Sequence, residues 1–500
     1  MIDLSRFEVW FVPGAQSLYG EVTLGKVTDH AREMVNALSS APGMPVKIVC
    51  QPVMVTAESI LELCLEANRS RNCIGIITWM HTFSPAQMWI PGLLALQKPL
   101  AHLHTQFNRD LPWSKIDMDF MNLNQSAHGD REFGFIGSRL RINRKVIAGF
   151  WQDQDVRDQL TTWTRAACAW NDAQTLKIAR FGDNMREVAV TEGDKIAAKV
   201  RLGYSVLGYG VGDLVEYVQA VLDHDVDRML SEYEGSYILS EPLRPKGKQR
   251  EALRDAARIE IGLRHFLDQG GFQAFTDNFQ TLHGLTQLPG VAVQRLMADG
   301  YGFGAEGDWK TAALVRSMKV MSTGLEGGTS FMEDYTYHFR SSGQVLGAHM
   351  LEICPSVAAA QPSLEVHPLS IGQKNDPVRL VFTARTGPAV VASIVDMGDR
   401  FRLVANKVNV ISPEQPVPKL PVARAVWVPE PDLEIASTCW ILAGGAHHTA
   451  LSLGLAIEHL EDFAEIAGIE FLLIDRETTV RNFKKELRWN DTCWHQMKPS

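Results

Sequence analysis

Two carboxylates and one or two imidazoles in the second half of the sequence could bind a metal ion. Glu306, Glu333 and His349 come first, and a Gly-Gly-Ala-His-His-Thr loop carrying His447 and His448 follows. Oxygen and nitrogen ligands without thiolates suit a six-coordinate divalent ion such as Mn²⁺, with positions left for water or substrate hydroxyls. Adjacent side chains in a loop usually diverge, so we expect one of the two loop histidines to bind the ion. Because the gaps are long, spacing alone leaves their convergence open.

The sequence around Glu333 predicts a β-hairpin that brings two of these residues together. Residues 330–339 and 345–353 are rich in aromatic and β-branched side chains, and 341–344 (Ser-Ser-Gly-Gln) is a turn signal. Folding about this turn places Glu333 directly opposite His349, with Cβ atoms about 5 Å apart. A register slip of one residue would put them on opposite faces. The alternative is a half-buried hairpin with a solvated glutamate and a packed histidine.

Glu306 lies within a literal G-x-G-x-x-G, residues 302–307. A dinucleotide-binding motif of this kind needs a strand before it and a helix after it. The preceding residues 291–297 predict a helix, so we reject a nucleotide site. We expect the glycines to shape a loop that presents Glu306 just before a helix beginning near Asp308.

Composition and charge narrow the class of protein. Five hundred residues imply two to four domains, and the net charge of −9, from 49 basic and 58 acidic residues, disfavours a nucleic-acid partner. The sequence has no recognisable signal peptide and no apolar run of the ~20 residues that a membrane span needs. Seven scattered cysteines without a C-x-x-C motif predict reduced thiols in a cytoplasmic protein.

The first 175 residues alternate strand and helix, which predicts a doubly wound, mostly parallel sheet. Ligand groups in such sheets lie on loops after the carboxyl ends of the strands. The residues expected on such loops are Gln16, Leu18, His81 and Phe83, together with a polar loop at 122–129 that contains His128.

The remaining sequence predicts two further domains. Residues 176–325 again indicate an α/β domain, with a strand at 176–180 and a long helix at 249–267. From 326 to 500 the pattern becomes mainly antiparallel β, with a small barrel or sandwich followed by terminal helices. We expect the run 378–384 to pair with 389–395, and the run 400–405 to follow.

Seven motifs resemble those of the L-arabinose isomerase family, and the resemblance covers essentially the whole chain. They are Glu8-Val9-Trp10-Phe11-Val12, His81-Thr82-Phe83-Ser84-Pro85, and the segments 118–125, 180–186, 306–310, 331–335 and 445–448. The resemblance implies a three-domain fold, in agreement with the pattern above. It implies a Mn²⁺ ion held by Glu306, Glu333, His349 and His448. It also implies a sugar pocket lined by Gln16, Leu18, His128, Met185, Phe279, Ile371 and His447.

The resemblance further implies interconversion of L-arabinose and L-ribulose, and of D-galactose and D-tagatose. Glu306 or Glu333 would move a proton between C2 and C1 through an enediol, and a hydride shift stays open. The alternatives are a ketol isomerase acting on another sugar such as L-fucose, a metal-dependent hydrolase, and a sugar-binding protein without catalysis.

An assembly of several chains is also expected. Gln16, Leu18 and His128 belong to the first predicted domain, whereas the predicted metal ligands lie beyond residue 300. We therefore expect each site to be shared between neighbouring subunits, and the resemblance implies a homohexamer or trimer with cyclic symmetry.

Overall fold

The computed structural model describes residues 2–340, 343–369 and 371–496. Contacts divide it into two compact units. The N-terminal unit contains Asp3–Asn171 and a return segment, Glu458–Gly468, whereas the larger unit contains Asp172–Ile457 and the segment that begins at Ile469. The described residues include no helix that is both long and apolar enough to span a membrane. The division at 175 and 325 into three domains stays a prediction.

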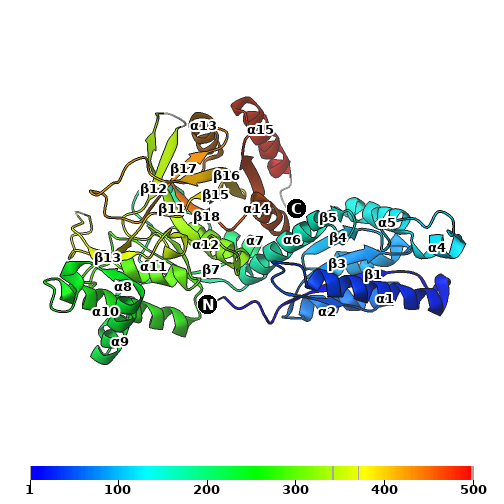
Figure 1. Cartoon of the computed structure of the whole chain (residues 1–500), viewed down its shortest axis with the longest axis horizontal. Helices are drawn as coiled ribbons and strands as arrows, with labels where there is room; N and C mark the ends of the chain where they lie inside the picture. The colour runs from blue at the N-terminus through cyan, green and yellow to red at the C-terminus, as the bar shows by residue number, and fades with distance from the viewer. Residues whose placement is uncertain (1, 341–342, 370, 497–500) are drawn as a thin grey trace. The chain divides into compact units, whose positions relative to one another are not determined.

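The N-terminal unit is built on a five-stranded, all-parallel sheet, which confirms the predicted doubly wound fold (Figure 1). All eight residues of the central strand β3 are buried, as expected for a strand covered on both faces. The strands, in sheet order, are β2 (Lys47–Cys50), β1 (Glu8–Gly14), β3 (Cys73–Met80), β4 (Leu100–His104) and β5 (Lys145–Ala148). The helices are α1 (Gly20–Ser39), α2 (Ala57–Arg69), α3 (Ile90–Ala95), α4 (Met118–Leu123), α5 (Ser126–Arg139), α6 (Gln154–Ala173) and the returning α14 (Ile457–Ala467).

The prediction of a polar loop at 122–129 was wrong, because α4 and α5 occupy most of this segment. His128 lies in the first turn of α5 and is exposed. The helix is held against the sheet at Gly129, where a Cβ atom would approach the backbone oxygen of Thr82 to 2.5 Å. Polar composition therefore hid a helix whose close packing depends on a glycine.

A four-stranded parallel sheet opens the larger unit and confirms the second α/β pattern. Its strands, in sheet order, are β10 (Gly302–Gly304), β9 (Ala274–Asp277), β6 (Lys177–Phe181) and β7 (Ser205–Tyr209). Its helices are α7 (Lys195–Leu202), α8 (Val211–Gln219), α9 (Asp223–Ser236), α10 (Arg250–Gly270), α11 (Gly290–Ala298) and α12 (Trp309–Met321).

The glycine motif at 302–307 is only partly a loop. The helix predicted before it is α11, but Gly302 and Gly304 form strand β10. Cβ atoms there would lie 2.1 Å and 2.3 Å from backbone oxygens at the start of α12, so the glycines allow strand and helix to pack directly. The amide donors at the start of α12 are capped by Asp308. A phosphate would have to compete with this carboxylate, which supports rejecting the nucleotide site on new grounds.

A mainly antiparallel β-barrel follows, as predicted (Figure 1). Six strands form a ring that the pairing of β15 with β16 closes, and β19 (Glu470–Ile474) adds to β16 in parallel. The ring strands, in order, are β15 (Gly387–Asp396), β18 (His448–Ser452), β11 (Thr329–His338), β12 (Gln344–Ala348), β17 (Arg424–Pro429) and β16 (Phe401–Ile411). Helices α13 (Leu433–Ala443) and α15 (Val480–Gln496) complete the C-terminal part.

One expected strand pairing was wrong. The run at 378–384 forms β14 (Val378–Val381), which pairs with β13 (Ser363–Val366) in a separate sheet with β8 (Ile238–Leu239), not with β15. Side-chain amides take the place of a second strand: Gln287 accepts from the backbone N–H of Val378, and Gln294 accepts from that of Leu380, both within 2.8 Å. The two amides thus bind the backbone N–H groups of Val378 and Leu380, which a pairing with β15 would have used.

Candidate metal centre

The hairpin of β11 and β12 forms, but its register differs from the prediction by one residue. Pairs next to the turn follow the expected register, whereas a β-bulge between Asp334 and Thr336 shifts the rest, so that Glu333 faces Ala348 instead of His349. Residues 341 and 342 of the expected turn lie outside the described residues. The second strand is also shorter than expected and ends before His349. His349 lies just beyond the end of this strand, and its Nε2 is still only 3.8 Å from the Glu333 carboxylate.

Glu306 lies on the tight connection between β10 and α12. Its φ of 62° is left-handed, and the next residue, Gly307, has φ of 84° and packs against Asn184. The backbone oxygen of Glu306 accepts from the N–H of Met185 at 2.9 Å, while Gly307 N–H donates to the Asp277 backbone oxygen at 2.9 Å. The strained residue is therefore fixed from two sides.

Strand β18 completes the group by bringing His448 into register with Glu333. The side chains of Glu306, His349 and His448 each offer a ligand atom, and these atoms lie within 4.8 Å of one another. Opposite ligands of one ion, each bound at about 2.2 Å, lie about 4.4 Å apart, so the three are close to the geometry of a shared ion. Glu333 adjoins this group through His349.

His448 is oriented for binding through Nε2. The ring is fully buried, and Nδ1 lies 3.2 Å from the Asp308 carboxylate, while Nε2 has no hydrogen-bond partner among the described residues. Nε2 is 3.7 Å from the Glu306 carboxylate. A carboxylate on one imidazole nitrogen fixes the tautomer that presents a lone pair at the other. The unpartnered Nε2 therefore fits a metal ligand.

Asp308 is held as an anion by its surroundings. Burial would raise the pKa of Asp308, but the buried Lys310 ammonium at 3.0 Å and the neighbouring His448 hold that pKa well below its usual value. Lys310 also donates to the backbone oxygens of Thr191 and Glu192 at 2.9 and 2.7 Å. A chain of polar contacts thus runs from Lys310 through Asp308 to His448.

Like His448, His349 has a carboxylate next to its Nδ1. Its Nδ1 hydrogen-bonds to Glu352, whose carboxylate also accepts from the Leu351 N–H at 2.9 Å. Burial lowers the pKa of His349, but Glu352 and then Glu333 outweigh it and raise that pKa to about 9. A metal ion would have to displace this proton before Nε2 could bind.

Other groups shape the field and the packing of the centre. Burial would raise the pKa of Glu306, but His447 and His448 lower it below its usual value. Burial and then Glu352 raise the pKa of Asp277 to about 7. The fully buried ring of Phe331 packs edge-on against His349 and His448, with centroids 5.2 and 5.4 Å away.

The prediction of site residues missed three that contact the histidines. Asp308 and Glu352 orient them, and Phe331 packs against both. Asp308 and Phe331 lie inside motifs that carried the family resemblance, and Glu352 is three residues after His349. Aspartate before a helix and glutamate after a strand have ordinary structural roles. Their contacts with histidine depend on the tertiary fold, which no local pattern displays.

The predicted sugar-pocket residues divide between the two units. Met185, Phe279, Ile371 and His447 belong to the larger unit, where His447 Nε2 lies 3.8 Å from the Glu306 carboxylate and Ile371 is 37% exposed. Gln16, Leu18 and His128 belong to the N-terminal unit, at the carboxyl edge of its sheet. There the His128 ring lies against Phe83 with centroids 4.7 Å apart, and Leu18 is 82% exposed.

Comparisons with known proteins identify the same family across the chain. The L-arabinose isomerase N-terminal, central and C-terminal domains match residues 3–175, 177–324 and 328–470. An L-arabinose isomerase from Koribacter versatilis (strain Ellin345) is 69% identical over 494 residues, covering 99% of both chains. Others from Herpetosiphon aurantiacus and Geobacillus kaustophilus are 63% and 58% identical, covering 100% and 99% of both chains.

Proposed function

Since the chain belongs to the L-arabinose isomerase family and is an aldose–ketose isomerase, we propose that it interconverts L-arabinose and L-ribulose. The same site would convert D-galactose to D-tagatose. The observation that carries the proposal is the buried group of Glu306, His349 and His448 in a chain with full-length relatives of that name.

The residues present fit a divalent ion, for which we propose Mn²⁺. Glu306, Glu333, His349 and His448 would hold it, and the partnerless Nε2 of His448 supports this assignment. Mixed carboxylate and imidazole ligands suit such an ion. When bound, the ion would polarise the sugar oxygens on C1 and C2 and stabilise the enediolate charge.

The two carboxylates are proposed as the acid–base groups. Either Glu306 or Glu333 removes the proton from C2 and returns it to C1, while a second proton passes from the C2 hydroxyl to the C1 oxygen. No atom enters or leaves, as an isomerisation requires. Interaction with His447 and His448 lowers the pKa of Glu306, so this carboxylate is ionised near neutral pH.

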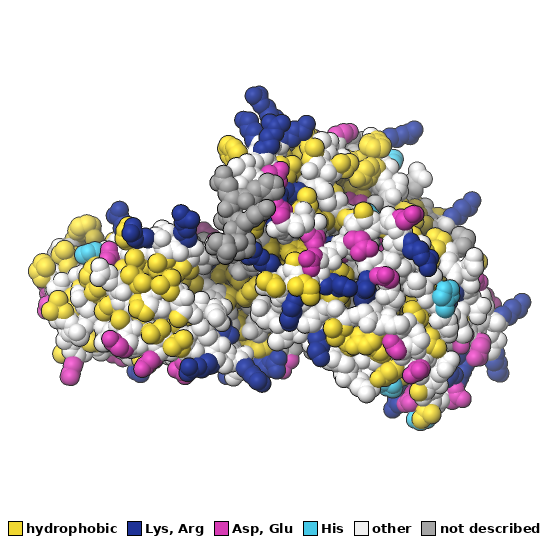
Figure 2. Space-filling view, turned by 180° about the vertical axis from the view of Figure 1, so that it is seen from behind, with side chains coloured by type: hydrophobic (Ala, Val, Ile, Leu, Met, Phe, Trp, Pro, Cys, Tyr) yellow, Lys and Arg dark blue, Asp and Glu magenta, His cyan; other side chains and the backbone are white. Residues whose placement is uncertain are grey.

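We further propose a cytoplasmic homohexamer or trimer in which neighbouring subunits share each sugar pocket. Apolar side chains gather over a face of the N-terminal unit (Figure 2). In the same unit Leu18, Trp113 and Met118 are 82%, 80% and 64% exposed, and a contiguous exposed apolar patch marks a site of protein–protein contact. A second copy of the chain would cover them and could receive Gln16, Leu18 and His128 into its pocket.

A panel of L-arabinose, D-galactose and L-fucose, assayed for ketose formation with Mn²⁺, tests the substrate. We expect L-arabinose to react fastest, D-galactose more slowly, and the product mass to equal that of the substrate. EDTA should abolish turnover and Mn²⁺ should restore it. Faster turnover of L-fucose would overturn the substrate assignment, and activity insensitive to EDTA would overturn the metal.

A further inference from the structure

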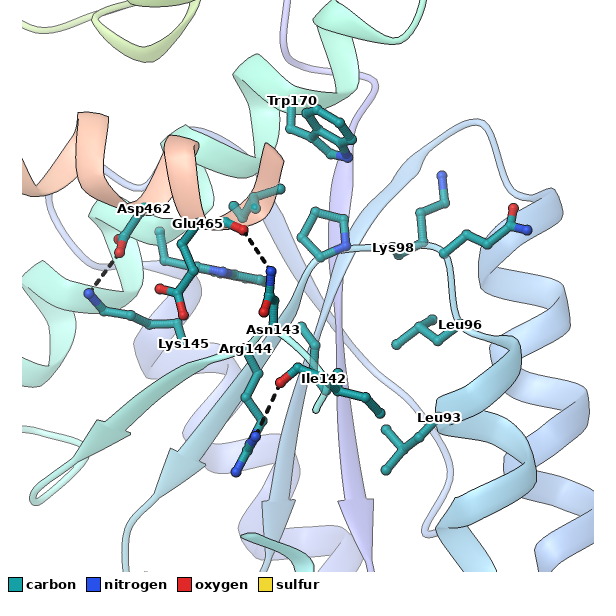
Figure 3. A pocket seen from close by; sticks show the side chains of 15 residues that line it. Leu93, Leu96, Lys98, Ile142, Asn143, Arg144, Lys145, Trp170, Asp462 and Glu465 are labelled. Atoms are coloured by element: carbon teal, nitrogen blue, oxygen red, sulfur yellow. Dashed lines mark hydrogen bonds and ion pairs between the residues drawn. The ribbon is translucent and has the colours of Figure 1, made fainter. Parts of the chain in front are cut away.

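The N-terminal unit contains a cavity at the edge of its sheet opposite the edge that carries Gln16 and His128. Its volume is about 250 Å³, and its walls come from the connection before β4, the connection before β5, and helices α3, α6 and α14 (Figure 3). All of its lining residues belong to this unit, so none is part of the metal centre.

The cavity combines aromatic and apolar walls. Trp163 and Trp170 line it from α6, and Leu93, Leu96 and Ile142 contribute aliphatic surface. Trp163 is 1% exposed, and its ring packs closely over Gly75, where a Cβ atom would approach it to 2.9 Å. The ring is therefore fixed, and a rigid indole wall suits the apolar face of a small ring-shaped ligand.

Charged groups of both signs complete the lining. Lys145 Nζ lies 2.7 Å from Asp462 on α14, and the Asn143 amide donates to the Glu465 backbone oxygen at 3.3 Å. Lys98 stands across the cavity from these groups (Figure 3) and donates to the Ser70 backbone oxygen at 3.2 Å. Three basic and two acidic side chains line the cavity, so it has little net charge.

Two lining residues keep a buried polar atom without a partner in the described part of the chain. These atoms are Trp163 Nε1 and Asp462 Oδ2, and Asp462 is 1% exposed. One is a donor and the other is an acceptor. Buried polar atoms are almost always satisfied by protein, water or ligand. A donor and an acceptor left free on one cavity indicate an occupant that both accepts and donates hydrogen bonds.

We propose that this cavity is a second binding site, for a neutral polyhydroxylated molecule about the size of a monosaccharide. Hydroxyl groups can accept from Trp163 and donate to Asp462, while the C–H face of the ligand packs against the indole wall. The balanced charge of the lining favours a neutral ligand. The competing occupant is ordered water, for which a volume of about 250 Å³ also has room.

Calorimetry and crystallography with myo-inositol and ribitol test the proposal on the full-length protein. Neither probe has a carbonyl group to isomerise, so turnover contributes no heat. Leu96→Trp, just after the end of α3, fills the cavity, whereas Leu94→Trp is a matched control two residues earlier, 66% exposed and outside the lining. Asp462→Asn removes the acceptor charge and serves if Leu96→Trp does not fold.

We expect at least one probe to occupy the cavity in soaked crystals and to bind in solution. Leu96→Trp should weaken that binding at least about tenfold, Leu94→Trp should leave it unchanged, and both should keep their isomerase activity. Only water in the cavity with both probes would overturn the proposal. Equal affinity in the two leucine variants, or density without heat, meaning binding at crystal concentration only, would overturn it as well.

Discussion

Replacing Glu352 with glutamine should weaken metal binding and flatten its dependence on pH. Burial lowers the pKa of His349, but Glu352 and its neighbours raise that pKa to about 9, so near pH 7 an ion must displace a proton from the ring. For each pH unit below this value, displacing the proton costs about 1.4 kcal/mol of the free energy of Mn²⁺ binding. Wild-type Mn²⁺ affinity should therefore rise about tenfold per unit, or about a hundredfold from pH 7 to pH 9, and then level off.

Glutamine keeps the size of Glu352 but removes the charge beside His349 Nδ1. The pKa of His349 falls, so the affinity should level off at a lower pH. Loss of the orienting carboxylate should lower the plateau affinity about 10–100-fold. Mn²⁺ titration calorimetry across this pH range measures both effects, with Glu326→Gln at an exposed position as the control. A Glu352→Gln protein with the wild-type slope and plateau would refute the orienting role.

Three further predictions concern the same centre and its assembly. Glu306→Gln and Glu333→Gln should each lower kcat about 10²-fold or more, and a variant that keeps more than about a tenth of wild-type activity is not the acid–base group. Asp308→Asn and Asp308→Ala should both lose Mn²⁺ affinity, but melting should show the alanine variant less stable by a further ~0.5–2 kcal/mol because only asparagine keeps the helix cap. Equal stability would argue against the cap. Co-refolding inactive Glu306→Ala and His128→Ala chains should restore activity, whereas verified mixed oligomers that stay inactive would show that each chain builds its site alone.

The parts of the fold that repeat regularly were predictable from the sequence. Buried strands such as 73–78 and amphipathic helices such as α1 carry their pattern locally, so the parallel sheets and the closed barrel were anticipated. The hairpin register was not, because one bulged residue near Tyr335 leaves composition and spacing unchanged while it shifts every pair beyond it. The pairing of β14 failed for a similar reason, since distant amides decide it.

The candidate site was also only partly predictable from the sequence. Glu306, His349 and His448 were proposed from residue type and family resemblance, and the fold brings their ligand atoms together. Asp308 and Glu352 escaped notice because their contribution is a contact with a histidine, which only the folded chain creates. The sequence thus pointed to atoms that could bind a metal, but not to those that orient them.

Anomalous diffraction at the manganese edge, on crystals of the full-length protein grown with Mn²⁺, tests the central claim most directly. The account predicts one strong peak about 2.2 Å from a Glu306 carboxylate oxygen and from Nε2 of His349 and of His448, with Glu333 completing the protein ligands. The absence of a peak at this position, or a peak only at other residues, would contradict it.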